Sequence, residues 1–268
     1  MKKLLIKITL FLIAVPSLYG QGELNEQQRI FFRNERSFAV MLNSDGIGVG
    51  YRDARRLNYL NKRFYEIEAA TLKHPKEYKL SSIYPQAGSF VFGKLNSVIY
   101  IRGGLGQQHE LFPKADLGGV AVRFIYSGGP VFALYKPIYY SIIRPISIDQ
   151  AVLREEKFDV QIHDPTMIYG RASFFKGLNE IKMLPGLYAR SGFNFEYSKE
   201  DKIIHAVEVG AQVNAFIKKI PIMETTQNKS IFFSFFVSYR FGIVVDPLNP
   251  ESNKLSNIFG RKRSAALY

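Results

Sequence analysis

The stretch that decides the fold is SIFFSFFVSYRFG, which runs from Ser230 to Gly242. Apolar side chains occupy every second position of this stretch: Ile231, Phe233, Phe235, Val237, Tyr239 and Phe241. The positions between them are mostly polar and include Ser230, Ser234, Ser238 and Arg240. A bilayer is spanned by roughly 9 to 11 residues of tilted strand, with alternate side chains in lipid and in a polar interior. The pattern therefore predicts a strand of an outer-membrane β-barrel.

The first residues have the features of a secretory signal peptide. Lys2 and Lys3 precede an apolar run over residues 4–15, and the small residue Gly20 closes a plausible cleavage site. The apolar run is shorter than the about 20 residues that a membrane helix needs. We therefore expect residues 1–20 to be removed on export.

Composition narrows the class of protein. The chain is 47% hydrophobic, yet its mean hydropathy is −0.07, as expected where each strand is half apolar and half polar. It has no cysteine, which excludes disulfides, thiolate metal sites and a lipid-modified cysteine. Its 36 basic residues against 23 acidic ones give a formal charge of +13, which favours an anionic partner. For an exported chain we expect outer-membrane lipid, lipopolysaccharide or an acidic protein, and no nucleic acid.

Several other segments repeat the alternation of the first stretch. Residues 187–197 and 203–215 alternate in the same way, and the polar link Lys199-Glu200-Asp201 joins them as a predicted hairpin. Shorter alternating runs cover residues 65–69, 95–105 and 120–126. The sequence therefore predicts an all-β fold, a transmembrane antiparallel barrel of about eight strands, with ten as the alternative. A soluble lipocalin-like barrel is the rival fold, and it would turn its apolar faces inward.

Two segments leave the strand pattern open. The alternation changes phase between Ser37 and Arg52, which either a bulge or a hairpin at Asn43-Ser44-Asp45-Gly46 explains. Residues 131–143 contain Pro137, and we expect them to form a separate strand that pairs with the preceding one through Ser127-Gly128-Gly129-Pro130.

The domain organisation follows from these strands. We expect a signal peptide over residues 1–20, a barrel over 21–244 and a periplasmic tail over 245–268. With the N-terminus in the periplasm, the links that we expect outside the cell are 53–60, 107–116, the long loop 144–184 and 218–229. Residues 73–89 are then long for a periplasmic turn.

Charged residues on the inner face of the predicted strands form the first candidate site. They are Glu66, Glu68, Lys94, Arg102, Arg123, Arg190, Glu196, Glu208 and Arg240. A barrel of about eight strands has an interior that its own side chains fill, and buried charges persist when they are paired. We therefore expect a lumen closed by ion pairs. A narrow selective pore or proton path is the alternative, and it needs more strands.

Evidence for chemistry is thin, so we predict no catalytic residue, no metal site and no cofactor. Asp159, His163 and Asp164 have a spacing that a metal site can have, but the same spacing is common in loops. His205 lies on the predicted lipid face, where a pairing with a serine would suggest hydrolysis of a lipid ester. The simpler explanation is an interfacial histidine near the lipid headgroups.

Two segments outside the strands are candidate binding surfaces. The long loop carries Phe174, Leu178 and Ile181 at helix-like spacing, which predicts either a lid over the barrel or a docking surface. The tail has charged and apolar residues suited to a periplasmic or outer-membrane protein partner: Ile258, Phe259, Arg261, Lys262, Arg263 and Tyr268. An inert disordered tail is the alternative.

The leader, the repeated amphipathic strands and the terminal FSFFVSYRFG resemble the small single-chain outer-membrane β-barrel proteins. The expected tail departs from the usual pattern of these proteins, which end on that strand. In size, leader and basicity the chain is also similar to the PorT and PorG accessory barrels of type IX secretion. The resemblance implies a non-enzymatic scaffold or accessory subunit of an envelope complex in a Gram-negative cell, with protein secretion as the narrower expectation. A small porin-like pore or transport protein is the alternative, and a lipid-modifying enzyme is a third class.

Overall fold

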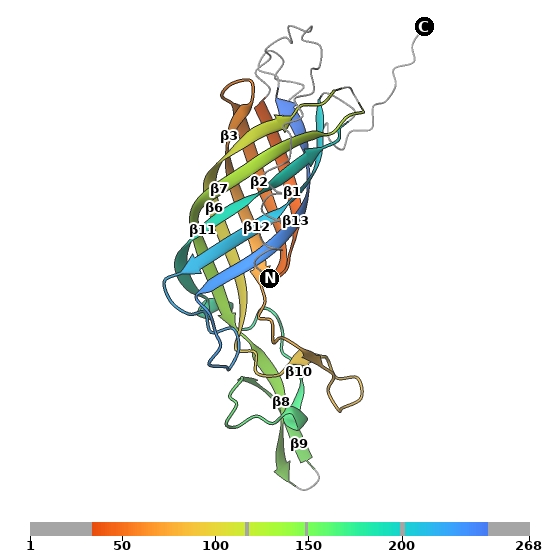
Figure 1. Ribbon diagram of the computed structural model, residues 1–268. Coiled ribbons are helices and arrows are strands. Elements are labelled where there is room, and N and C mark those ends of the chain that lie inside the picture. Colours follow the sequence, from red (N-terminus) through yellow and green to blue (C-terminus); the bar gives the residue numbers. More distant parts are fainter. Residues whose placement is uncertain (1–33, 116–117, 148–149, 199–201, 246–268) are drawn as a thin grey trace, which may run out of the picture. The chain divides into compact units, whose positions relative to one another are not determined.

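The computed structural model describes residues 34–115, 118–147, 150–198 and 202–245. Eight antiparallel strands in this part of the chain form one closed barrel, in the order β1-β13-β12-β11-β7-β6-β3-β2 (Figure 1). Their bounds are β1 Asn34–Asn43, β2 Gly46–Arg56, β3 Asn61–Leu72, β6 Asn96–Phe112, β7 Ala121–Pro137, β11 Lys182–Glu196, β12 Ile203–Phe216 and β13 Ile231–Val245. The predicted antiparallel barrel of about eight strands is confirmed. The predicted tail 245–268 begins one residue inside β13, and 246–268 lie outside the described residues.

Shorter elements lie outside the barrel. Strands β4 (Lys79–Leu80) and β5 (Phe90–Val91) form a two-stranded sheet. The connection from β7 to β11 holds β8 (Tyr139–Ser147), β9 (Gln150–Lys157), β10 (Ile168–Arg171) and two 3-10 helices, Pro165–Met167 and Leu178–Glu180. In the described part of the chain, no helix has both the length and the apolar character needed to cross a membrane.

The alternation in sequence becomes a difference between the two faces of the wall. On β13, Phe235 is 63% exposed whereas the preceding Ser234 is fully buried. Ile231, Phe233 and Val237 are exposed on the same side as Phe235. The barrel thus turns its apolar side chains outward and buries charged ones, which contradicts the lipocalin-like alternative.

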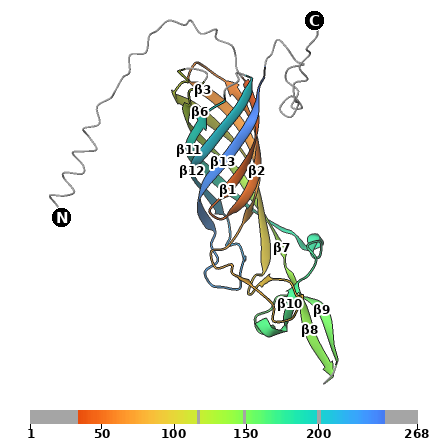
Figure 2. The same cartoon turned by 90° about the vertical axis from the view of Figure 1, so that its right-hand side faces the viewer.

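A tight hairpin explains the phase change in the first part of the chain. β1 pairs with β2 from Glu35↔Ala54 to Asn43↔Gly46, so Ser44 and Asp45 form the turn. β1 also closes the barrel against β13, and Figure 2 shows these two strands side by side. Of the two explanations that the sequence left open, the hairpin is therefore the one observed.

This hairpin changes which connections share an end of the barrel. Because β1 and β2 are separate strands, the β2–β3 and β6–β7 connections lie at the end where β1 begins and β13 finishes. The prediction that 53–60 and 107–116 lie at the opposite end is wrong. Residues 73–95 instead share the other end with 138–181 and 217–230, which gathers the long connections together.

Two further expectations are corrected. β7 runs without a turn through Ser127-Gly128-Gly129-Pro130, because these residues pair with β11 up to Lys182↔Tyr135. Residues 131–137 therefore extend β7, and β8 pairs with β9 in a different sheet. The helix-like spacing of Phe174, Leu178 and Ile181 yields only the short 3-10 helix Leu178–Glu180.

Candidate functional site

The centre of the lumen is organised around Glu208 on β12. This carboxylate is fully buried and contacts three guanidinium groups, with N–O distances of 2.7 Å to Arg52, 3.1 Å to Arg190 and 3.0 Å to Arg240. Asn194 donates a further hydrogen bond of 2.9 Å. These residues come from β2, β11, β12 and β13, and each occupies an inward position of its strand. One carboxylate thus ties together strands that are distant in sequence.

Two glutamates on β3 extend this cluster. Glu66 lies 2.8 Å from Arg52 and accepts a 2.6 Å hydrogen bond from Ser127 on β7. Glu68 pairs with Arg102 on β6 and Arg190 on β11. All of these side chains are buried. An isolated buried charge is strongly unfavourable, so each guanidinium group lies against at least one carboxylate, although Arg102 Nη1 and Arg190 Nε have no hydrogen-bond partner in the structure.

Aromatic rings flank the buried guanidinium groups. The Arg52 guanidinium carbon lies 4.0 Å from the centre of the Phe64 ring, and that of Arg190 lies 3.8 Å from Phe236. Phe236 is thus an inward residue on β13 and is only 2% exposed. Cations over ring faces gain energy where water is excluded. The rings also fill the space between the charged side chains, so the lumen is packed as well as paired.

A second ion-pair cluster lies toward the end where β1 begins. Glu196 pairs with Arg123 and lies 3.0 Å from Lys114, which follows β6. Lys62 pairs with Glu35. The Lys62–Glu35 pair links β3 to the beginning of β1 across β2, and the Arg123–Glu196 pair links β7 to β11.

An apolar plug closes the other end of the lumen. It consists of inward residues of the strands and of Ile220, Ile222 and Met223 from the β12–β13 connection. Ile220 and Ile222 are fully buried. The strand residues of the plug include Leu72, Val98, Tyr100, Val131, Tyr188 and Phe216. From one end to the other, the interior is therefore occupied by ion pairs, rings and then apolar side chains.

The structure places most of the predicted inward charges in the barrel interior. Eight of the nine are buried on barrel strands or beside them: Glu66, Glu68, Arg102, Arg123, Arg190, Glu196, Glu208 and Arg240. Lys94 is the exception and needs correction. It precedes β6 and pairs with Glu77 in the β3–β6 connection, since β6 begins only at Asn96.

On the described strands, sequence reasoning missed the buried inward charges Glu35, Arg52 and Lys62. Arg52 is the most important, because it bridges Glu66 and Glu208. The alternation with the outward residues Val49 and Tyr51 was sufficient to predict that Arg52 faces inward. The unresolved phase change in that segment hid the signal. The predicted tail residues, from Ile258 to Tyr268, lie outside the described residues.

The candidate metal ligands of the long connection, Asp159, His163 and Asp164, make hydrogen bonds within the protein. The Asp159 N–H donates to His163 Nδ1 at 3.0 Å, so Nε2 carries the proton toward Glu156 at 3.2 Å. Arg144 also donates to Glu156 and, chiefly through this hydrogen bond, lowers the pKa of Glu156 to about 2. Asp164 caps the 3-10 helix Pro165–Met167. Asp159, His163 and Asp164 thus stabilise the local structure of the connection. Among the described residues, no cluster suited to a metal occurs.

His205 lies in a ring of aromatic side chains on the outer face. Its Nδ1 is 2.8 Å from the hydroxyl of Tyr239, and its ring stacks with Tyr197 and Tyr239. Ser198 contacts the backbone of His205, since the His205 N–H donates to Ser198 Oγ at 2.6 Å. The imidazole is therefore paired with a phenol, as in an interfacial aromatic girdle, and the serine needed for ester hydrolysis does not contact it.

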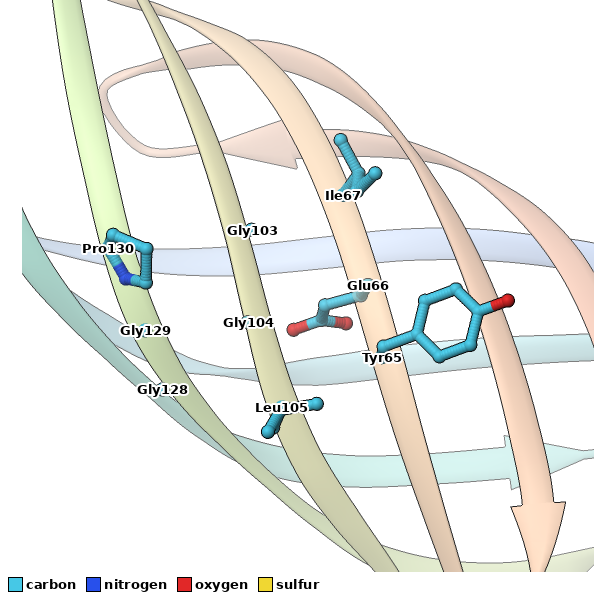
Figure 3. A pocket seen from close by; sticks show the side chains of 9 residues that line it. All are labelled: Tyr65, Glu66, Ile67, Gly103, Gly104, Leu105, Gly128, Gly129 and Pro130. Carbon is cyan, nitrogen blue, oxygen red and sulfur yellow. The ribbon is translucent and has the colours of Figure 1, made fainter.

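A hollow of about 410 Å³ lies on the wall where β6 and β7 run side by side (Figure 3). Strand pairing is interrupted there, between Arg102↔Val131 and Leu105↔Gly128. Pro130 lacks an N–H, and a Cβ on Gly104 would lie 2.2 Å from the Tyr188 hydroxyl inside the barrel. The rim consists of Tyr65, Ile67 and Leu105, which face outward. The hollow is thus a shallow, mostly apolar depression in the outer surface, where four glycines leave the barrel wall without side chains.

No protein-family model and no curated protein matches the chain. Among solved structures, the Yersinia pestis attachment invasion locus protein Ail is similar at a TM-score of 0.38 and 7% identity, covering 81% of this chain and 100% of that one. The N-terminal β-barrel domain of Pseudomonas aeruginosa OprF has a TM-score of 0.35 and 6% identity, covering 80% and 99%. Neisserial surface protein A has 0.33 and 10%, covering 80% and 97%. At these values the likeness carries no functional information.

Proposed function

We propose that this protein is an integral outer-membrane β-barrel that acts as a scaffold or accessory subunit of an envelope complex. The observation that carries the proposal is the contrast between the two faces of the wall. Apolar side chains such as Phe233, Phe235 and Val237 are exposed outside, whereas Glu208 and its arginines are buried inside. In lipid, a strand must satisfy its backbone by pairing with neighbours, which a closed barrel does.

The filled lumen supports a role for the outer surfaces. Eight strands enclose a space just wide enough for side chains, and here ion pairs and an apolar plug occupy it. A solute has no open route through such an interior, so binding through the loops and outer wall is the function that this architecture favours. The basic charge of the chain suits lipid phosphates, lipopolysaccharide or an acidic protein partner. Within this proposal, an accessory role in protein secretion is the finer hypothesis.

The membrane assignment predicts heat-modifiable migration and recovery with outer membranes. Unboiled protein should keep its closed barrel in detergent and migrate differently from boiled protein on a denaturing gel. Cell fractionation with the same gel checks both points. Recovery of the mature chain in the soluble periplasmic fraction would contradict the proposal.

The closed lumen predicts no steady ion conductance. Purified protein in planar bilayers should give a flat current trace, because both the Glu208 cluster and the plug around Ile220 and Ile222 block the path. An Ile220→Gly/Ile222→Gly variant loosens only the plug and should remain closed. Steady conductance of the unaltered protein would favour the small-pore alternative over the scaffold.

A further inference from the structure

The segment from Ser173 to Gly177 covers the outer face of β7 near its end. Lys136 has the same parity as Pro130 and Phe132, which are exposed outward, yet Lys136 is only 6% exposed. Its ammonium group donates to the carbonyl oxygens of Phe174 at 2.7 Å and Lys176 at 2.8 Å. These two bonds attach the segment to the outer side of the wall. That side carries the exposed apolar side chains of the barrel strands, here called the apolar belt.

The belt continues up to this segment. β11 pairs with β7 through Met183↔Leu134 and Leu187↔Pro130. Met183 and Leu187 are 63% and 68% exposed. The apolar belt thus follows β7 and β11 toward the end of the barrel. The segment from Ser173 to Gly177 lies beside the last residues of β7.

Two phenylalanines remain exposed on the attached segment. Phe174 and Phe175 are 52% and 75% exposed, and their ring centres lie 5.9 Å apart, nearly perpendicular. Two cations lie close to the Phe174 ring. The Arg171 guanidinium carbon lies 6.0 Å from the Phe174 ring, and the Lys136 ammonium lies 4.9 Å from it. Lys182, at the start of β11, is also exposed.

We propose that Phe174 and Phe175 form an anchor that inserts into the lipid interface at the long-loop end of the barrel, with Arg171 and Lys182 contacting anionic lipid phosphates. The inference rests on the proposed membrane location of the barrel and adds a defined lipid-contact site to it. Aromatic side chains beside cations are suited to the boundary between acyl chains and headgroups. Continuity with the apolar belt, rather than with the lumen, selects lipid as the occupant.

Tryptophan fluorescence provides a direct test, because the chain contains no tryptophan. Phe175→Trp places a single reporter in the anchor. Phe235→Trp is the positive control on the apolar belt. Ile162→Trp is the matched exposed control, in a turn that packs against β8 through Phe158. Each protein is reconstituted in vesicles of phosphatidylcholine, or of phosphatidylcholine with phosphatidylglycerol, with and without bromine on the acyl chains.

We expect brominated lipid to quench Phe175→Trp nearly as strongly as Phe235→Trp, and to leave Ile162→Trp little changed. Quenching of Phe175→Trp should rise with phosphatidylglycerol, and adding Arg171→Gln and Lys182→Gln should remove that rise. If Phe175→Trp behaves like Ile162→Trp while Phe235→Trp is quenched, the anchor is excluded and the membrane barrel stands. If Phe235→Trp is also unquenched, both proposals fail.

Discussion

Glu208→Gln is expected to destabilise the barrel more than any other single change considered, by about 3–5 kcal/mol. Glu208 neutralises Arg52, Arg190 and Arg240, and all four side chains are buried. The amide keeps the size of the side chain but removes its charge. Arg240 then loses the carboxylate with which it pairs, and Arg52 and Arg190 keep only their pairs with Glu66 and Glu68. Urea unfolding in lipid vesicles, followed by the gel shift of the folded form, measures the change in the free energy of unfolding.

Glu155→Gln is the matched control for this variant. Glu155 pairs with Lys176, but both side chains are about two-fifths exposed, at 41% and 40%. Exposed pairs contribute little to stability, so the unfolding curve should barely move. Equal losses for the two variants would show that the buried cluster around Glu208 is not a source of stability.

Phe235→Arg should cost roughly 2–4 kcal/mol if the outer face lies in lipid, because a cation near the midplane of a bilayer is poorly solvated. Phe235 lies near the centre of the outward apolar run from Ile231 to Phe241 on β13 and is 63% exposed. Ile231→Arg, at the first residue of the same strand, has nearly the same exposure, 60%. Near an interface the cost falls to about 0–1 kcal/mol. Because both variants introduce the same side chain, the difference between them reports the depth of each position in the bilayer.

The same unfolding assay compares the two arginine variants in lipid vesicles and in aqueous buffer without lipid. Identical effects at positions 235 and 231 would contradict a membrane-spanning β13. Ser234→Arg, which the alternation alone suggests as a mild substitution, is a poor control. Ser234 is fully buried and accepts a 3.0 Å hydrogen bond from Gln212, so an arginine would overpack the lumen.

Alternation made the barrel predictable from the sequence. A strand has a period of two, so the exposed Phe235 and the buried Glu208 could each be assigned a side once the strand was recognised. The number of strands was predicted only as about eight, with ten left open, because the segments 37–52 and 131–143 did not show a single clear alternation. Most inward charges were found for the same reason.

What the sequence could not supply was contact across the barrel and the interpretation of glycine and proline. Gly128-Gly129-Pro130 has the composition of a turn, yet β11 pairs with it throughout and β7 continues without a break. Lys94 was assigned inward because nothing local marks Asn96 as the first residue of β6. The connection that holds Phe174 takes its conformation from Lys136, a contact over 38 residues that no local periodicity reveals.

The pairing of β1 with β13 has a consequence for how the protein is made. Asn34 and Val245 are hydrogen-bonding neighbours in space but stand at opposite ends of the described chain. Every partial product of synthesis therefore has two unmatched edges, and neither can be covered until the last strand arrives. Such edges recruit other chains, and long-range closure is slow. Deleting β13 should therefore leave the edges of β1 and β12 uncovered and give an aggregate rather than a smaller closed barrel.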